Sequence, residues 1–285
     1  MRRISLALLA ATALSTGAVE SSLAGPAPAA ATWTGFYLGG NVGYSWGNDD
    51  VTLNGLTISG TSLPGIGSSS FKPSGAIGGL QAGYNWQFAP NWLLGFETDF
   101  QWTNQKDTLT STSTFSSSSC FGLGSPTCSV TGASGSANLI AKIDWLGTVR
   151  GRFGYVTGRT LFYGTGGLAY GRVYHSLTGS LAGTFFDSSN CEGGCTFGAN
   201  VMGDGSAINV GWVLGAGVES FLPNSNNWTW RVEYLYVDLG TINETVPFSG
   251  SVTISGLGST PIGGTASYSA HVTDQILRAA LSYKF

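Results

Sequence analysis

The stretch WLLGFETDFQW at residues 92–102 decides the fold, because large apolar side chains alternate in it with polar and charged ones. One face carries Trp92, Leu94, Phe96, Phe100 and Trp102, and the other carries Glu97, Asp99 and Gln101. Alternation with a period of two residues indicates a β-strand whose two faces meet different surroundings. The same alternation at 141–155 sets Ile143, Trp145, Val149, Phe153 and Tyr155 against Asp144, Thr148, Arg150 and Arg152. Both segments therefore predict strands with aromatic rings on one side and charges on the other.

Eight segments of this kind follow one another along the chain. They span 35–46, 75–88, 92–102, 141–155, 160–173, 207–221, 228–238 and 277–285. In 160–173 both faces contain apolar residues, so the direction of its side chains stays open.

The connections between these strands alternate in length. Four of them, 47–74, 103–140, 174–206 and 239–270, are long and rich in Ser, Thr and Gly, whereas the three between them are tight turns. Antiparallel strands joined in this way place every long loop at one end, which is typical of bacterial outer-membrane barrels. The chain is predicted to be all-β: one eight-stranded antiparallel up-and-down transmembrane β-barrel over residues 33–285, with four long extracellular loops and both termini in the periplasm.

The composition excludes other classes of protein. Only 9% of the 285 residues are charged, with 12 Lys and Arg against 15 Asp and Glu. The chain has no cluster of Lys and Arg, so we expect no nucleic-acid partner. Aromatic residues (12%) and hydrophobic residues (42%) are too frequent for a disordered chain. No stretch of 18 apolar residues follows the N-terminal segment, which excludes a helical membrane protein.

The size of the aromatic side chains decides which face points outward. A soluble eight-stranded barrel buries its apolar face, whereas a membrane barrel exposes it to lipid. The interior of eight strands is only wide enough for side chains to fill, and the apolar faces carry eight Trp. We therefore expect the rings to contact membrane lipid in two girdles. One contains Trp92, Tyr155, Trp228, Tyr283 and Phe285, and the other contains Trp46, Trp102 and Trp212.

The N-terminal segment has the features of an export signal. Arg2 and Arg3 precede an apolar stretch over 4–14, and Ser22-Leu23-Ala24 supplies small residues for cleavage after Ala24. A second cleavage position lies between Ala29 and Ala31. We therefore expect residues 1–24 to be a signal peptide and 25–32 a flexible lead-in. The alternative, a buried N-terminal helix, does not explain the Arg pair and the small-residue site.

The polar faces predict a network of charges in the lumen of the barrel. Its members are Glu97, Asp99, Asp144, Arg150, Arg152, Glu219, Arg231, Glu233, Arg278 and Lys284, with Arg172 as a further candidate. Buried charges are costly unless they are paired, and the two signs are nearly balanced here. A polar pathway for small solutes is one interpretation. An ion-paired plug is the other, and the narrow lumen favours it.

The four cysteines lie in two of the long loops. An exported protein meets an oxidising compartment, so we expect disulfide bonds. Three pairings are open, and the local pairs Cys120–Cys128 and Cys191–Cys195 are the simplest. The loops lack His and the spacings do not match zinc patterns, so we expect no metal site.

His175 and His271 are the two histidines, both at the rims expected to face outward. They are the candidates for haem ligation, because imidazole ligates iron. They lie on strands that are not neighbours, so two solvated side chains are the simpler interpretation. Ser is abundant in the loops, but no acid is placed to orient either His, and we expect neither catalytic residues nor a cofactor.

Several segments resemble one known family. They are WTGFYLGGNVGYSWG (33–47), WLGTVRGRFGYV (145–156), YGTGGLAYG (163–171), VEYLYVDLG (232–240) and LRAALSYKF (277–285). They are similar to the small outer-membrane β-barrels of Gram-negative bacteria, in particular the porin-family surface antigens of alphaproteobacteria, related to OmpA-like and opacity-type barrels. The resemblance implies an eight-stranded barrel in the outer membrane. It also implies that the terminal aromatic residue, Phe285, is recognised by the outer-membrane assembly machinery.

These observations together predict an integral outer-membrane protein with a structural or surface-interaction role, and not an enzyme. Its expected partners are membrane lipid, the assembly machinery and an extracellular ligand bound through the loops. A narrow diffusion porin for small solutes and a loop-mediated haem or ligand receptor remain the alternatives.

Overall fold

The described part of the chain is almost entirely β-strand in the computed structural model, which describes residues 32–58, 61–117, 129–187, 191–254 and 258–285. The predicted signal peptide and most of the lead-in lie outside these residues. The ten strands are β1 (Gly35–Ile58), β2 (Thr61–Phe71), β3 (Ser74–Ala89), β4 (Trp92–Thr103), β5 (Lys106–Ser117), β6 (Ser129–Thr157), β7 (Thr160–Asp187), β8 (Cys191–Phe221), β9 (Trp228–Ile254) and β10 (Gly258–Lys284). No helix that could cross a membrane occurs in the described ranges.

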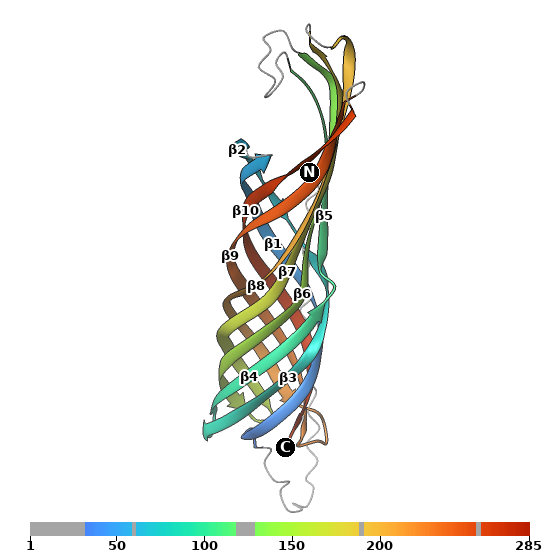
Figure 1. The fold of residues 1–285 in the computed structure, drawn as a ribbon. Helices are drawn as coiled ribbons and strands as arrows, with labels where there is room; N and C mark the ends of the chain where they lie inside the picture. The colour runs from blue at the N-terminus through green and yellow to red at the C-terminus, as the bar shows by residue number, and fades with distance from the viewer. Residues whose placement is uncertain (1–31, 59–60, 118–128, 188–190, 255–257) are drawn as a thin grey trace, which may run out of the picture. The chain divides into compact units, whose positions relative to one another are not determined.

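Eight of the ten strands form a closed antiparallel ring (Figure 1). Their order around the ring is β1, β10, β9, β8, β7, β6, β4 and β3, and β3 closes on β1 from Gly35↔Asn85 to Trp46↔Ser74. The predicted eight-stranded barrel is confirmed. The other two strands, β2 and β5, pair with the outer parts of β1 and β6.

The four long connections contain far more strand than the sequence predicted. β6 and β7 stay paired as far as Ser129↔Phe186, and β9 and β10 as far as Ile254↔Gly258. These tracts are rich in Ser, Thr and Gly, which weakens the hydrophobic alternation by which a strand is recognised in a sequence. They continue strands that are already paired, so the ladder of backbone hydrogen bonds extends into them, and Ile242 and Ala270 within them are buried.

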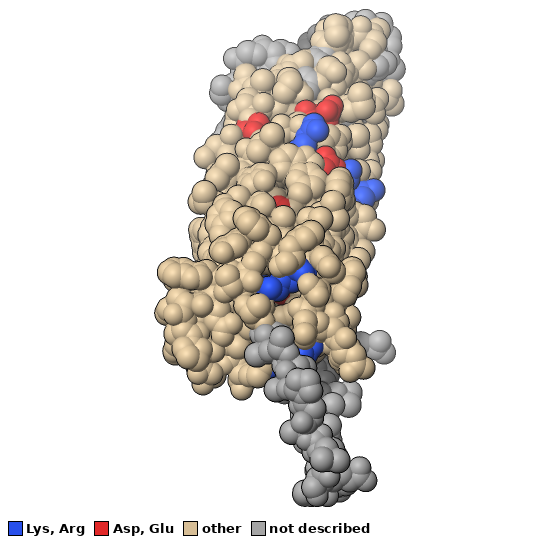
Figure 2. Space-filling model, turned by 90° about the horizontal axis from the view of Figure 1, so that it is seen from below, with Lys and Arg blue, Asp and Glu red and all other residues tan. Residues whose placement is uncertain are grey.

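The aromatic rings point outward and the polar side chains point inward, as predicted. Phe96 is 53% exposed, whereas the next residue, Glu97, is 0% exposed. Most of the surface seen in Figure 2 is uncharged, with Lys, Arg, Asp and Glu in a few separate groups. The open question of 160–173 is also settled: Leu161, Tyr163 and Thr165 are buried inside, and Phe162 and Leu168 are exposed.

A register shift in β6 reverses one part of the predicted pattern. Ile143 pairs with Val173 and Trp145 with Arg172, so Asp144 is an extra residue in β6. An inserted residue turns every preceding side chain to the opposite face. Ile143 is therefore buried inside the barrel instead of facing outward with Trp145.

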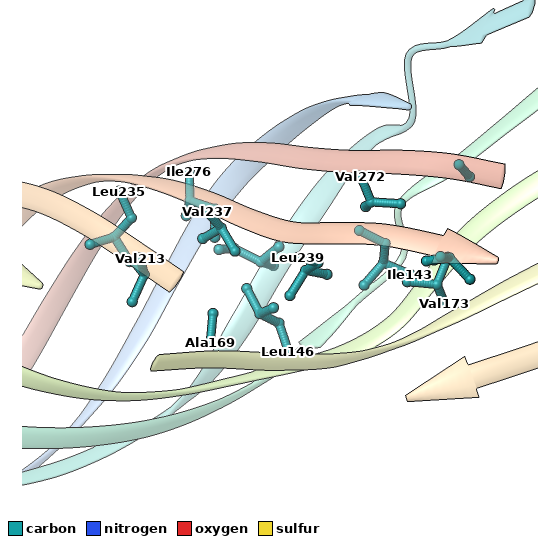
Figure 3. Close-up of a cluster of buried hydrophobic side chains, with 13 residues drawn as sticks. Ile143, Leu146, Ala169, Val173, Val213, Leu235, Val237, Leu239, Val272 and Ile276 are labelled. Carbon is teal, nitrogen blue, oxygen red and sulfur yellow. The ribbon is translucent and has the colours of Figure 1, made fainter. Parts of the chain in front are cut away.

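Buried apolar side chains fill the interior on one side of the charged residues (Figure 3). Along β10 and β9, Ile276 and Leu235 are the next inward positions after Arg278 and Glu233, toward the long connections. The cluster consists of Ile77, Ile143, Leu146, Ala169, Val173, Val213, Leu235, Val237, Leu239, Ile242, Ala270, Val272 and Ile276. The alternation pattern did not predict this core, which occludes the lumen between the charges and the long connections.

Candidate functional site

Eight of the ten predicted lumen residues form one buried charge network. Alternation along five strands turns each of them inward, and each is at most 3% exposed. The acids are Glu97 and Asp99 of β4, Glu219 of β8 and Glu233 of β9, and the bases are Arg150 and Arg152 of β6, Arg231 of β9 and Arg278 of β10. Four negative charges thus meet four positive ones.

Arg150 and Arg278 hold the half of the network that is nearer the long connections. The Arg150 guanidinium donates to Glu97, to Asp99 Oδ2 at 2.9 Å and to Glu233 Oε1 at 3.0 Å. Arg278 Nη2 donates to the same Asp99 oxygen at 2.9 Å and to Glu233 Oε2 at 2.6 Å. Asp99 and Glu233 therefore each bridge the guanidinium groups of Arg150 and Arg278, which are far apart in the sequence.

Arg152 and Arg231 hold the other half. Arg152 Nη2 donates to Glu219 Oε2 at 2.6 Å, and its guanidinium lies 4.0 Å from the centre of the Tyr163 ring. Arg231 Nη1 donates to Glu97 Oε2 at 2.5 Å. Glu97 thus joins the two halves, because it accepts from both Arg150 and Arg231.

Three hydroxyl groups complete the shell around the acids, and the sequence analysis did not single out any of them. Tyr37 donates to Glu97 at 2.6 Å, Tyr163 to Glu233 at 2.8 Å and Thr229 to Glu219 at 2.8 Å. Tyr37 is an even number of residues away from Asn41 and Ser45 in β1. Continued alternation could therefore have predicted that it faces inward with them. Tyr163 lay in the segment whose facing was ambiguous. The Tyr37 and Tyr163 hydroxyls share their acceptor oxygens with Arg231 and Arg150, whereas Thr229 satisfies the Glu219 oxygen that Arg152 does not reach.

Two predicted members lie apart from the network. Asp144 is the inserted residue of β6 and forms a half-exposed ion pair with Lys142 at 2.5 Å, so its assignment to the lumen was wrong. Arg172, 4.0 Å from Asp144, is exposed as well. Lys284 is buried near the C-terminal end of β10, but no carboxylate of the described residues lies within 4.0 Å of its nitrogen.

The two histidines lie in separate surroundings. His175 Nδ1 is 3.1 Å from the hydroxyl of Tyr268, and burial lowers the pKa of His175 to about 4. His271 is half-exposed, with Nε2 3.6 Å from Asp238 Oδ2 and Nδ1 3.3 Å from Thr241 Oγ1. His175 pairs with Ala141, beyond the aromatic belt at Trp145. The two rings share no contact, so the geometry gives no support to a joint haem site.

The predicted disulfide bonds remain predictions. Cys120 and Cys128 lie outside the described residues, and so do the side chains of Cys191 and Cys195. The backbone of β8 slips here, so that the four steps from Cys191 to Cys195 oppose only two steps of β7. Two steps of strand span about 7 Å, which is at the upper limit for the Cα atoms of a disulfide.

Phe285 ends the chain at the rim of the barrel. Its ring is 70% exposed on the outer face and contacts Tyr283 with a centroid distance of 5.2 Å. Its backbone N–H donates to the carbonyl of Phe36 at 2.9 Å, so the last residue is still bound to β1.

Comparison with known proteins places this barrel in a family. The model of the outer membrane protein beta-barrel domain matches residues 6–285. The 31 kDa outer-membrane immunogenic protein of Brucella melitensis is 34% identical over 248 residues, which cover 83% of this chain and 85% of that protein. The 22 kDa outer membrane protein of Rhizobium leguminosarum is 31% identical over 213 residues, covering 75% of this chain and 67% of that protein.

The chain is also similar to a solved structure. The outer membrane protein OprG of Pseudomonas aeruginosa is 14% identical and covers 88% of this chain and 96% of its own, with a TM-score of 0.36. The family model and the two sequence relatives carry the assignment. The chain belongs to the outer membrane protein beta-barrel family and resides in the outer membrane.

Proposed function

We propose that this protein is a closed, non-enzymatic barrel that anchors a polar, surface-exposed β-structure in the outer membrane. In this proposal the long connections lie outside the cell and both ends of the barrel domain face the periplasm. The observation that carries it is the filled lumen. The outer parts of the strands then become the surface available for interaction.

Two layers of side chains argue against the alternative of a diffusion porin. The charge network crosses the lumen with eight buried and mutually paired groups, and the apolar cluster lies directly beyond it. A solute would have to displace several ion pairs and then pass an apolar core. Eight strands leave little more room than these side chains occupy.

A groove on the polar extension supports the surface-interaction part of the proposal. It has a volume of about 460 Å³ and is lined mainly by hydroxyl groups of β5, β6 and β7. The lining residues are Thr112, Thr114, Ser134, Gly135, Ser136, Ser180 and Ala182. Such a surface suits polar, uncharged ligands, since hydroxyl groups both donate and accept hydrogen bonds.

Conductance in planar bilayers tests the proposal. The refolded chain is expected to give no large, stable channel, because the network blocks the lumen. A variant that combines Arg150→Ala and Arg278→Ala with Leu235→Ala and Ile276→Ala removes side chains from both layers and is expected to increase ion leakage. Asp144→Asn, which alters only a half-exposed charge, is the matched control. A well-resolved channel of nanosiemens scale in the wild-type protein would show that the lumen conducts and that the proposal is wrong.

A further inference from the structure

Two buried carboxylates lie beyond the charge network, and neither has a cationic partner. Asp274 precedes Arg278 by four residues on the inward face of β10, and Asp49 is on β1. They are 2% and 1% exposed. Within the described residues no Lys, Arg or His nitrogen lies within 4.0 Å of either carboxylate. These acids differ in this respect from the four acids of the network.

Neutral groups contact only one of the two carboxylates. Ser45 Oγ donates to Asp274 Oδ2 at 3.0 Å, and Gln105 Nε2 donates to Asp274 Oδ1 at 2.9 Å. Neither oxygen of Asp49 has a hydrogen-bond partner in the part of the chain that the structure describes. Asp49 is therefore a buried acceptor whose bonding capacity is unused.

The register of β1 and β10 brings these groups to one place. Asp274 is directly opposite Gly47, and Ser45 and Asp49 flank that glycine two residues away on either side. Residues two apart in a strand share a face, so Ser45, Asp49 and Asp274 all point inward. Diagonal neighbours of this kind are about 7–8 Å apart at their backbones, within reach of a shared ion.

Two further carboxylates lie near Asp49. Asp50 of β1 and Asp107 of β5 add further negative charge near Asp49. Asp50 accepts from Ser70 Oγ at 2.6 Å, and Asp107 accepts from the backbone N–H of Lys72 at 2.7 Å. The side chains of Lys72 and Lys106, the nearest bases along the chain, are exposed. Two unpaired carboxylates buried side by side are costly unless a positive charge joins them.

We propose that Asp49 and Asp274 bind a hard divalent cation, such as Ca²⁺ or Mg²⁺, with Ser45 Oγ and the Gln105 amide as neutral neighbours. Carboxylate, hydroxyl and amide oxygens are the ligands that these ions prefer. The ion supplies the positive charge that the chain itself provides in the network through four arginines.

The sheet is interrupted beside this site. β2 pairs with β1 and β5 pairs with β6, but β2 and β5 are not neighbours in the sheet. The only residue pair that joins β3 to β5 is Ser74↔Lys106. Gln105, which reaches Asp274, lies at this seam, next to Lys106. In the proposal the ion reaches Asp49 and Asp274 through this seam.

Calorimetric titration tests the site. The refolded chain in detergent is stripped with EDTA and titrated with CaCl₂ and then with MgCl₂. One saturable site per chain is expected. Asp49→Asn and Asp274→Asn should each weaken it by at least about tenfold, since even indirect partners of metal ligands have effects of that size. Asp144→Asn should bind as the wild type does. Absence of saturable binding, or equal binding in all variants, contradicts the proposal.

A stability measurement keeps the test independent of the behaviour of any one variant. Ca²⁺ should raise the temperature at which the wild-type chain unfolds in SDS, and EDTA should lower it. Asp49→Asn has no hydrogen bond to lose and should fold, but without this response to Ca²⁺. If the wild-type chain is equally stable with EDTA and Ca²⁺, the two carboxylates carry protons and the cation site does not exist.

Discussion

Glu97 is the residue on which the charge network converges. It is completely buried, lies within 4.0 Å of all four network arginines and accepts a hydrogen bond from Tyr37. Removing one partner of a buried ion pair leaves the other charge without compensation, whereas exposed pairs contribute little. Buried ion pairs such as those of Glu97 therefore affect the stability of the fold much more than exposed ion pairs do.

The variant Glu97→Gln tests this difference. It keeps the size of the side chain but leaves the four surrounding arginines with one negative charge fewer. We expect the free energy of unfolding to fall by about 3–5 kcal/mol. Asp144→Asn, which affects a half-exposed ion pair, should change it by less than about 1 kcal/mol. Urea unfolding in detergent micelles measures the stability of both variants. Equal losses of stability would contradict the expectation that the buried ion pairs matter more than the exposed one.

His175 makes stability depend on pH. Its pKa is lowered by burial to about 4 from an ordinary value of 6.5, so the folded chain keeps it neutral where the unfolded chain would protonate it. Stability contributed by neutral His175 is therefore present above pH 6.5 and is lost as the pH falls from 6.5 toward 4.

The variant His175→Gln isolates this contribution from other titrating groups. As the pH is lowered from 7 to 4.5, the unfolding free energy of the wild type should fall more than that of His175→Gln. His271→Gln, which replaces a half-exposed ring, serves as the control and should show a smaller change. A difference that stays constant over this pH range would show that His175 is not held neutral by the fold.

Within β6, a single extra residue decides what fills the barrel. Before Asp144 the odd-numbered residues Ala141 and Ile143 face inward, and after it the even-numbered residues Leu146 and Thr148 do. The insertion lets β6 contribute Ile143 to the apolar cluster before it, and Leu146 and the two network arginines to the interior after it. Without it, Ile143 would face outward and Lys142 inward.

Deletion of Asp144 should therefore damage only one part of the molecule. The segment before position 144 would turn its apolar side chains outward and open the core around Ile143. The remaining ring, from Trp145 onward, keeps its register. We expect protease sensitivity within 129–143, while the mobility shift on heating in SDS is retained. Asp144→Gly keeps the residue count and should stay resistant. If the deletion variant is unfolded throughout, or if it behaves as the wild type does, the expectation that only the segment before position 144 is affected is wrong.

At the scale of the whole molecule, the barrel is inverted relative to a soluble protein. Rings such as Trp102 and Phe96 are exposed on its outer face, while charged groups are buried in its centre. The family assignment places this outer face in membrane lipid. In that surrounding every backbone group of the ring must find its partner within the protein, which a closed sheet achieves.

The sequence by itself determined the eight ring strands and the direction of most of their side chains, because alternation is a local property of a strand in contact with two different surroundings. The tertiary structure decided the partners. Glu97 and Arg231 are 134 residues apart and meet only because the ring closes. The inserted Asp144, the polar extensions and the diagonal placement of Asp49 and Asp274 likewise depend on register between strands. Register is set by contacts across the closed ring, which a single strand does not encode.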